Sequence, residues 1–223
     1  MRQSIHRSLL IGAAAASLLA ACAGPSGGKS GMSFFVTSAN PGKGGDLGGL
    51  DGADKYCQKL AAAAGAAHRT WHAYLSKQPL NGEAGINARD RIGKGPWTNA
   101  KGDLIAISVD DLHSAGNMLN KQRALTETGA GINGRGDTPN QHDMLTGSQP
   151  DGTFIAGDVN TTCSNWTVGD DSATAMVGHH DRTGLDDSVP AKSWNSSHLS
   201  RGCSPDALKA TGGAGLFYCF AVD

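Results

Sequence analysis

The sequence predicts a loop-rich α+β domain. Glycine occurs 32 times in the 223 residues, and clusters of Asn, Asp, Ser and Gly separate short apolar runs, which is typical of turns between short strands. One stretch, residues 51–65, carries its apolar residues at helical spacing instead. We therefore expect two helices that flank a small, mostly antiparallel sheet, with a long loop region from about Asn87 to Asp187 and beyond. Because loops carry most binding residues, we expect the functional site in that region.

The clearest elements lie in the first part of the domain. Aromatic and β-branched residues over 32–37 predict a strand, and the alternating pattern over 71–75 predicts another. Between them, Asp51 is the expected N-cap of a helix that continues to Gly65. The helical spacing points Cys57 toward the core.

Fewer elements can be predicted in the rest of the chain. A short apolar stretch ends the segment 97–107. Ser108, with Asp111 three residues later, approximates a capping box for a second helix over 109–119. The final run, 215–222, is continuously apolar, which predicts a buried central strand.

The N-terminus predicts export. Arg2 and Arg7 precede an uncharged apolar run over 9–21, which is the pattern of a secretory signal and is too short to span a membrane. The run ends in Leu-Ala-Ala-Cys at 19–22, which resembles a bacterial lipobox. That resemblance implies that residues 1–21 are a removed signal peptide and that Cys22 carries lipid. An ordinary cleaved signal with an incidental thiol is the alternative.

The mature chain divides into a tether and one domain. Residues 22–31 are rich in Gly and Ser and cannot bury enough apolar surface to fold. Residues 32–223 have the length of a single domain, and no second tether interrupts them. By its resemblance to other lipoproteins, with Ala23 after the lipidated cysteine, the protein is expected in the cell envelope at the outer membrane, periplasmic or surface-exposed.

Net charge argues against one class of partner. Without Arg2 and Arg7 the chain has 17 basic and 20 acidic residues, a net charge of about −3. Nucleic-acid binding needs a basic footprint that this balance does not supply. We expect no nucleic-acid partner, and we expect membrane association through the N-terminal lipid.

The cysteines predict disulfides. With Cys22 lipidated, an even number remains: Cys57, Cys163, Cys203 and Cys219. Outside the cytoplasm, two disulfides are the expected result. A zinc site on these thiols is the alternative, but no pair has the C-x-x-C spacing. Spacing alone leaves three connectivities.

Several blocks resemble the endostatin region of collagens, which has the C-type lectin-like fold. The segment 48–76 is similar to a helix start that bears a cysteine and leads into a strand. The segment 146–152 and the cysteine three residues before tryptophan in 163–166 are similar to a second block, and Cys203 and 217–219 complete the pattern. The resemblance covers most of the domain and implies two nested bridges, Cys57 to Cys219 and Cys163 to Cys203.

The resemblance also implies a candidate Ca²⁺ site. Sugar-binding C-type lectins use a Gln-Pro-Asp triplet, with a cis proline, and a Trp-Asn-Asp triplet; the counterparts here are 149–151 and 194–196. Gln149, Asp151 and Asn195 would supply oxygen ligands, as Ca²⁺ requires. Ser196 replaces the second carboxylate, so Ca²⁺ binding should be weak. The alternative is a simple Pro-Asp-Gly turn.

Histidines of the loop-rich half form a second candidate site. His179, His180 and Asp181, with His142-Asp143 and His198, have the residue types of a transition-metal cluster. Adjacent side chains of an extended chain point to opposite sides, so at most one of His179 and His180 should face a given site. Polar loop histidines that form ordinary hydrogen bonds are the alternative.

Two further patterns are weaker. Arg135-Gly136-Asp137 matches the integrin tripeptide, but in a Gly-rich stretch a turn is the simpler interpretation. The four tryptophans are expected mostly in the core, although Trp166 is a candidate ligand contact. No G-x-S-x-G, H-E-x-x-H or phosphate-loop motif is present.

The sequence thus favours a binding protein over an enzyme. The first hypothesis is a lectin-like module that binds a glycan or another extracellular or envelope macromolecule through Gln149, Asp151, Trp166 and Asn195. The alternatives are a metal-dependent cell-envelope enzyme that uses His142, His179, His180 and His198, and an envelope scaffold without a ligand. Fold alone does not separate them.

Overall fold

The computed structural model describes Met1, residues 30–80 and residues 82–223. The predicted signal peptide, Cys22 and nearly all of the predicted tether lie outside the described residues. Within these ranges the chain forms an α+β domain with four helices, two 3-10 turns and eight strands. The elements in chain order are β1 (Phe34–Val36), α1 (Gly49–Ala63), β2 (Trp71–Ala73), η1 (Ala88–Asp90), β3 (Trp97–Thr98), β4 (Leu104–Ala106), α2 (Val109–Leu112), β5 (Asp143–Leu145), α3 (Cys163–Trp166), β6 (Met176–His179), η2 (Pro190–Lys192), β7 (His198–Leu199), α4 (Pro205–Thr211) and β8 (Gly213–Ala221).

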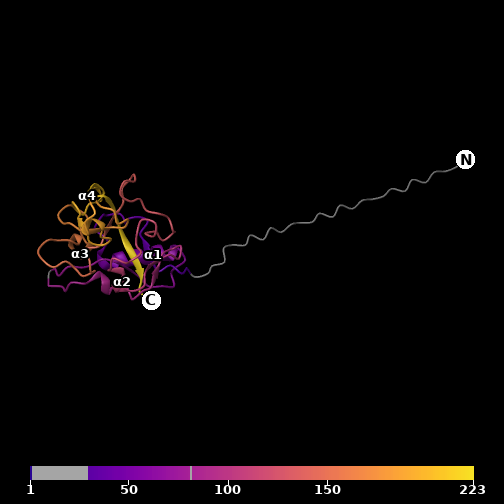
Figure 1. Cartoon of the computed structure of the whole chain (residues 1–223), viewed down its shortest axis with the longest axis horizontal. Helices are drawn as coiled ribbons and strands as arrows, with labels where there is room; N and C mark the ends of the chain where they lie inside the picture. The colour runs from indigo at the N-terminus through magenta and orange to yellow at the C-terminus, as the bar shows by residue number, and fades with distance from the viewer. Residues whose placement is uncertain (2–29, 81) are drawn as a thin grey trace.

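The last strand organises the sheet. Six strands form one mixed sheet in the order β1-β8-β5-β6-β7, with β2 also paired to β8, and β3 and β4 form a separate pair. β8 is antiparallel to β1 and β2 and parallel to β5. Figure 1 shows β8, in yellow, crossing the middle of the domain. The sheet is therefore mixed, with a single parallel pairing among its named strands.

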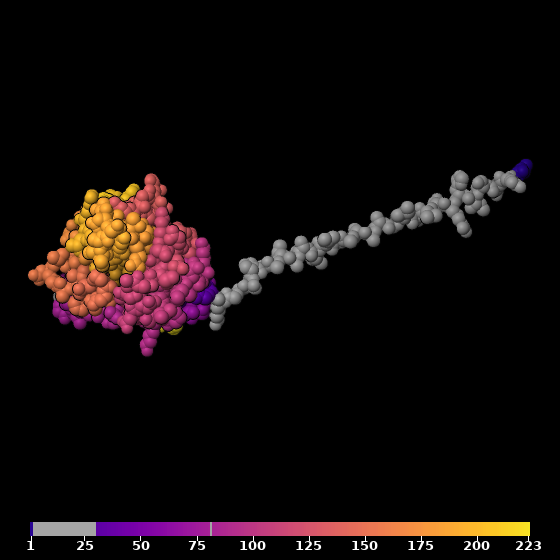
Figure 2. Space-filling view, viewed as in Figure 1, coloured from indigo at the N-terminus to yellow at the C-terminus, as the bar shows by residue number. Residues whose placement is uncertain are grey.

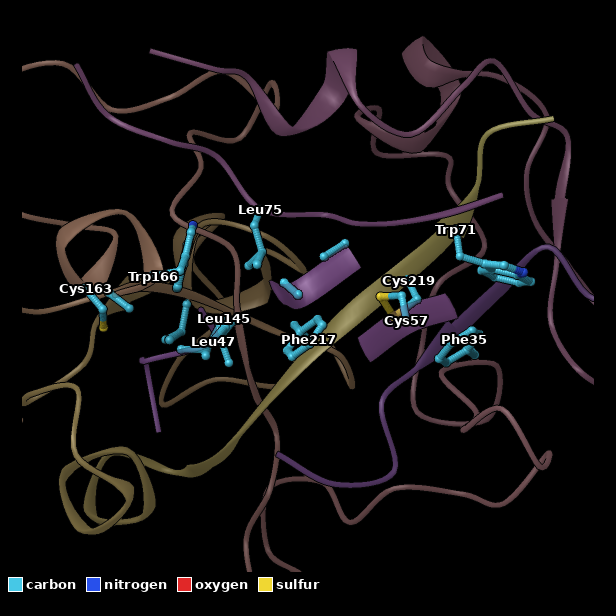
Figure 3. Packing of buried hydrophobic residues seen from close by; sticks show 14 of the residues in the cluster. Phe35, Leu47, Cys57, Trp71, Leu75, Leu145, Cys163, Trp166, Phe217 and Cys219 are labelled. Atoms are coloured by element: carbon cyan, nitrogen blue, oxygen red, sulfur yellow. A yellow bond between two sulfur atoms is a disulfide. The ribbon is translucent and has the colours of Figure 1, made fainter. Parts of the chain in front are cut away.

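Both faces of β8 are buried. Phe217 and Cys219 point to one apolar cluster, whereas Tyr218 and Phe220 point to another, as the two-residue period of a strand requires. Figure 3 shows the first cluster along β8, with Phe217 and the Cys57–Cys219 bridge between helix and strand. The prediction of a buried, continuously apolar final strand is confirmed.

The first helix lies close to its predicted position but begins differently. α1 begins at Gly49, and its N-cap Gly48 has a left-handed backbone with no side-chain hydrogen bond. Asp51 is therefore a first-turn residue and not the N-cap, because the chain needs a positive φ to enter the helix at Gly48. Ala53, Cys57 and Ala61 are the buried face, as the helical spacing predicts.

Two expectations for the other helices are wrong. Ser108 does cap α2, since its hydroxyl accepts from the Asp111 N–H, but α2 ends at Leu112 rather than near residue 119. The helix α4 was not expected, although Ser204 caps it and Pro205 begins it. Of the helices described, none is both long enough and apolar enough to cross a lipid bilayer.

Two disulfides are formed, with the pairing that the resemblance implies. Cys57 on α1 is bonded to Cys219 on β8, and Cys163 is bonded to Cys203. The first bridge closes a separation of 162 residues and the second one of 40. All four sulfur atoms lie in the first apolar cluster. The bridges are consistent with a protein outside the cytoplasm.

We expect the outer bridge to stabilise the domain more than the inner one. In the chain-entropy model, the longer loop makes loss of Cys57–Cys219 cost roughly 1 kcal/mol more than loss of Cys163–Cys203. The paired variants Cys57→Ser/Cys219→Ser and Cys163→Ser/Cys203→Ser should be compared by urea unfolding. Each double variant places two serines at buried cysteine positions of the same apolar cluster, so each variant is a control for the other. A larger loss for the inner pair would contradict this expectation.

Candidate metal centre

Three neighbouring strands bring histidines and one aspartate to the same end of the sheet. Asp143, the first residue of β5, pairs directly with His179, the last residue of β6. His198 begins β7 and pairs with Val177, two residues before His179. Directly paired residues share a face of the sheet, as do residues two apart on a strand, so these side chains meet. His142 immediately precedes β5 and joins them.

The donor atoms of this cluster are spaced like the ligands of one ion. Asp143 Oδ1 lies 3.1 Å from Nε2 of His142, 3.3 Å from Nε2 of His179 and 3.7 Å from Nε2 of His198. The Nε2 atoms of His179 and His198 are 3.0 Å apart. Tetrahedral ligands at about 2.0–2.1 Å from a zinc ion lie about 3.3–3.4 Å from one another. The donor atoms of His142, Asp143 and His179 lie within 4.8 Å of one another and fit a single metal ion, with His198 beside two of them as a further donor.

The carboxylate of Asp143 lacks a conventional partner. Its side chain is only 3% exposed, and neither oxygen accepts a well-aligned hydrogen bond. A buried carboxylate in that condition costs on the order of several kcal/mol. Histidine contacts could neutralise it only if the rings were protonated, yet the rings of His142 and His179 stack at 4.1 Å. Two stacked imidazolium cations would repel, whereas neutral rings on a metal ion would not.

Each ring of the cluster also has an acceptor behind it. Nδ1 of His179 lies 2.7 Å from the carbonyl of Ala191, and Nδ1 of His198 lies 3.2 Å from the carbonyl of Leu199. Nδ1 of His142 lies 3.4 Å from Oδ1 of Asp181. With its proton on Nδ1, each ring turns the Nε2 lone pair toward Asp143, which is the tautomer that a metal ligand needs.

Charged and polar neighbours shift the pKa values of two groups in and beside the cluster. Burial opposes ionisation of Asp181, but hydrogen bonds from His142 and from the backbone N–H groups of Arg135 and Thr183 lower its pKa to about 2. Asp181 is therefore an ionised acceptor behind the His142 ring. For His179, burial by itself lowers the pKa, but contacts with the Asp143 carboxylate and the Ala191 carbonyl raise it overall. Contacts between a carboxylate and an imidazole contribute to both shifts, together with backbone hydrogen bonds.

The cluster opens into a pocket. His142, His179 and His198 line a cavity of about 500 Å³. His142 and His179 are almost completely buried, whereas the His198 side chain is 41% exposed. The walls come mostly from the last third of the chain, whose light orange to yellow segments gather together on the surface in Figure 2. An ion held here would be accessible from the cavity.

The donor set selects a class of metal. Three imidazole nitrogens and one carboxylate oxygen suit Zn²⁺ and other divalent first-row transition ions, whereas Ca²⁺ and Mg²⁺ prefer oxygen ligands alone. All four cysteine sulfurs of the described residues are in disulfides, so thiolates do not contribute. Chemistry at this site therefore depends on nitrogen and carboxylate ligation.

One residue of the predicted histidine cluster does not belong to it. His180 is completely buried, with Nε2 3.1 Å from the carbonyl of Asn133 and Nδ1 unpartnered. It points away because side chains alternate along an extended chain, and only His179 of the adjacent pair faces the cluster. The sequence identified His142 and Asp143 as possible members, but no motif indicated that Asp143 lies at the centre.

The predicted calcium triplet forms a turn. The Gly152 N–H donates to the Gln149 carbonyl at 2.9 Å, and the Gln149 N–H donates to the Thr153 carbonyl at 2.8 Å. Asp151 is exposed, and hydrogen bonds from the backbone and side chain of Thr153 lower its pKa. The Gln149–Pro150 bond is trans, not cis as the resemblance implies. The turn that the sequence offered as the alternative is therefore present.

Asn195 does lie beside that turn, but it contributes its NH₂ group. Its Nδ2 donates to the carbonyl of Gln149 at 3.0 Å, to the carbonyl of Pro150 at 3.2 Å and to the hydroxyl of Tyr74 at 2.9 Å. Its Oδ1 accepts from Ser193. Asn195 thus connects the turn to the core, and its oxygen does not converge with the Asp151 carboxylate.

Trp166, which the sequence offered as a candidate ligand contact, lies in the core. Its side chain is completely buried, and its ring N–H donates to the carbonyl of Ser76 at 2.8 Å. A buried ring cannot stack on a sugar. All four tryptophans lie in the core, as the composition predicts; the other three are Trp71, Trp97 and Trp194.

Comparisons with known proteins leave the site to be judged on its geometry: no protein-family model matches the sequence, and no curated protein matches it. Two observations are independent of any relative. The Asp143 oxygens are buried without hydrogen-bond partners, and three Nε2 atoms surround one of them. The predicted calcium residues show no comparable convergence.

We expect Asn195 to have a structural role. Asn195→Ala should lower the free energy of unfolding by about 1–3 kcal/mol, with or without Ca²⁺, because it leaves the buried groups around it with one partner fewer. The control Asp151→Ala, at an exposed side chain, should change stability by less than about 0.5 kcal/mol. Urea unfolding with and without Ca²⁺ measures both. A wild-type stabilisation by Ca²⁺ that both variants lose would instead favour the calcium site.

Proposed function

We propose that this chain is an exported metal-binding protein that holds one divalent transition-metal ion on His142, Asp143, His179 and His198. The observation that carries the proposal is the buried Asp143 carboxylate, which has no hydrogen-bond partner and is surrounded by three imidazole nitrogens. The ion would lie at the floor of the cavity that the three histidines line. Zn²⁺ is the simplest probe of this donor set.

A buried ion-pair cluster is the competing explanation. It requires His142 or His179 to be protonated beside Asp143, and the raised pKa of His179 is compatible with that form. The metal explains more of the geometry, because all three rings have an acceptor behind Nδ1 and present Nε2 inward. An ion pair with Asp143 would need only one histidine ring oriented in this way.

Ligand capture fits the cavity better than hydrolysis. Hydrolysis at a metal centre needs a base beside the bound water, whereas ligand capture needs only an open approach to the ion. The acidic side chain of the described cavity wall is Asp186, which is exposed and accepts a hydrogen bond from Ser188. It is not placed as a buried base. We therefore propose a binding function, in which a ligand reaches the ion from the cavity as an additional ligand.

We also propose that the domain has the C-type lectin-like, endostatin-like architecture. The pairing of the first helix with the last strand through Cys57–Cys219, and the nested Cys163–Cys203 bridge, support this assignment. So does the pairing of the first and last strands, β1 and β8. Glycan binding is the second candidate function, because Pro150, Trp194 and Asn195 line a separate cavity of about 290 Å³. A glycan array with and without EDTA tests it.

The Asp143→Asn variant tests the metal proposal in two directions. It should weaken Zn²⁺ binding at least about 100-fold. Mutation of a residue that only hydrogen-bonds to a metal ligand already lowers metal affinity about 10–100-fold, and Asp143 is proposed as a direct ligand. It should leave the stability of the metal-free protein unchanged or higher, because it removes a buried charge without hydrogen bonds. Calorimetric titration with Zn²⁺ and urea unfolding in EDTA give the two values.

Histidine variants supply the matched comparison. His198→Gln should also abolish tight Zn²⁺ binding, whereas His68→Gln, at an exposed histidine outside the cluster, should not. If Asp143→Asn lowers the stability of the metal-free protein by about 3–5 kcal/mol, the ion-pair explanation is favoured instead. Equal Zn²⁺ affinity in wild type and His198→Gln would also count against the metal centre.

A further inference from the structure

We infer that the metal centre binds an organic carboxylate with an apolar body, and that the side chains of Arg135 and Arg201 hold the carboxylate against the ion. This inference rests on the proposed metal site and names the class of its ligand. Three features carry it: the charge of the cavity, the way Arg135 is positioned and the apolar part of the wall.

The cavity has cations without partners. Arg135 and Arg201 line the same cavity as the three histidine ligands. Across residues 30–80 and 82–223, neither guanidinium forms an ion pair or a side-chain hydrogen bond, and each residue is bonded only through its backbone N–H. A divalent ion on the floor would add further positive charge. Such a cavity favours an anion, and guanidinium groups bind carboxylates with charge-assisted hydrogen bonds.

Arg135 is positioned by the same residue that supports the metal ligand. Its backbone N–H donates to Oδ2 of Asp181 at 2.6 Å, while Oδ1 of Asp181 faces the His142 ring. Asp137, the acid of the integrin-like tripeptide, is bonded to Lys121 and to the Gly134 N–H. Asp137 is therefore engaged elsewhere, and Arg135 is left to face the cavity.

The wall beside the cations is apolar. Leu185, Pro190, Ala191 and Leu199 line the cavity together with the arginines. Leu185 is 87% exposed, so its side chain is available to contact a bound ligand. A volume of about 500 Å³ lies in the range of small-molecule sites. Inorganic phosphate would meet the charge requirement but would leave this wall uncovered, so a carboxylate that carries a hydrocarbon group fits better.

Cobalt provides a direct readout. The purified protein loaded with Co²⁺ should show a visible absorption spectrum that changes when a ligand reaches the ion. Benzoate, acetate, benzamide and inorganic phosphate are the probes. Benzoate should change the spectrum saturably and bind about tenfold more tightly than acetate, because its ring covers the apolar wall. Benzamide, without charge, should cause no change.

Arginine variants locate the anion. Arg135→Gln and Arg201→Gln should each weaken benzoate binding about tenfold, the effect of losing one charge-assisted hydrogen bond, and leave Co²⁺ affinity unchanged. The control Lys94→Gln removes an exposed cation that does not line this cavity and should change neither value.

The outcomes separate the inference from the metal proposal. Absence of a Co²⁺ spectrum would overturn the metal site, and the inference with it. Co²⁺ binding with no response to benzoate would overturn the inference alone. Phosphate or benzamide binding as tightly as benzoate would overturn the assignment of an apolar carboxylate. Unchanged benzoate affinity in both arginine variants would overturn their role.

Discussion

β8 is the constraint on which the rest of the domain depends, because it pairs with three other strands and carries one half of the outer disulfide. Its parallel pairing with β5 sets Asp143 opposite Gly213. A Cβ at Gly213 would lie 2.9 Å from the Cβ of Asp143, so only glycine allows this approach. A Cβ at Gly178 on β6 would lie 2.0 Å from the Trp194 carbonyl. The metal cluster therefore depends on close backbone packing at two glycines.

The cluster is an unfavourable element of the metal-free fold, and other parts of the domain offset it. A buried carboxylate without hydrogen-bond partners favours unfolding. The two disulfides and the two apolar clusters on either side of β8 act in the opposite direction. A site that is costly until an ion binds is typical of function rather than of structural support. Binding of an ion at the proposed site would consequently be linked to folding.

The sequence predicts local features of this fold better than it predicts the site. The β8 run and the buried face of α1 are visible because burial imposes a period on neighbouring residues. The α4 helix is missed because seven residues give too little periodicity, although Ser204 and Pro205 are start signals. His142, His179 and His198 could be named from residue type, but their convergence depends on strand register across dozens of residues. No spacing rule distinguishes His179 from His180 until the register is known.

Asp181 connects the two halves of the proposed site. It contacts the His142 ring through one carboxylate oxygen and fixes the backbone of Arg135 through the other. In the proposed site, an ion that held His142 in place would also favour the observed position of Asp181 and, through it, of the Arg135 backbone. Thermodynamic linkage makes such coupling reciprocal: an anion that binds better to the metal-loaded protein must raise the affinity for the metal by the same factor. If the proposed metal and anion both bind, they are therefore partners in one binding equilibrium, coupled through Asp181.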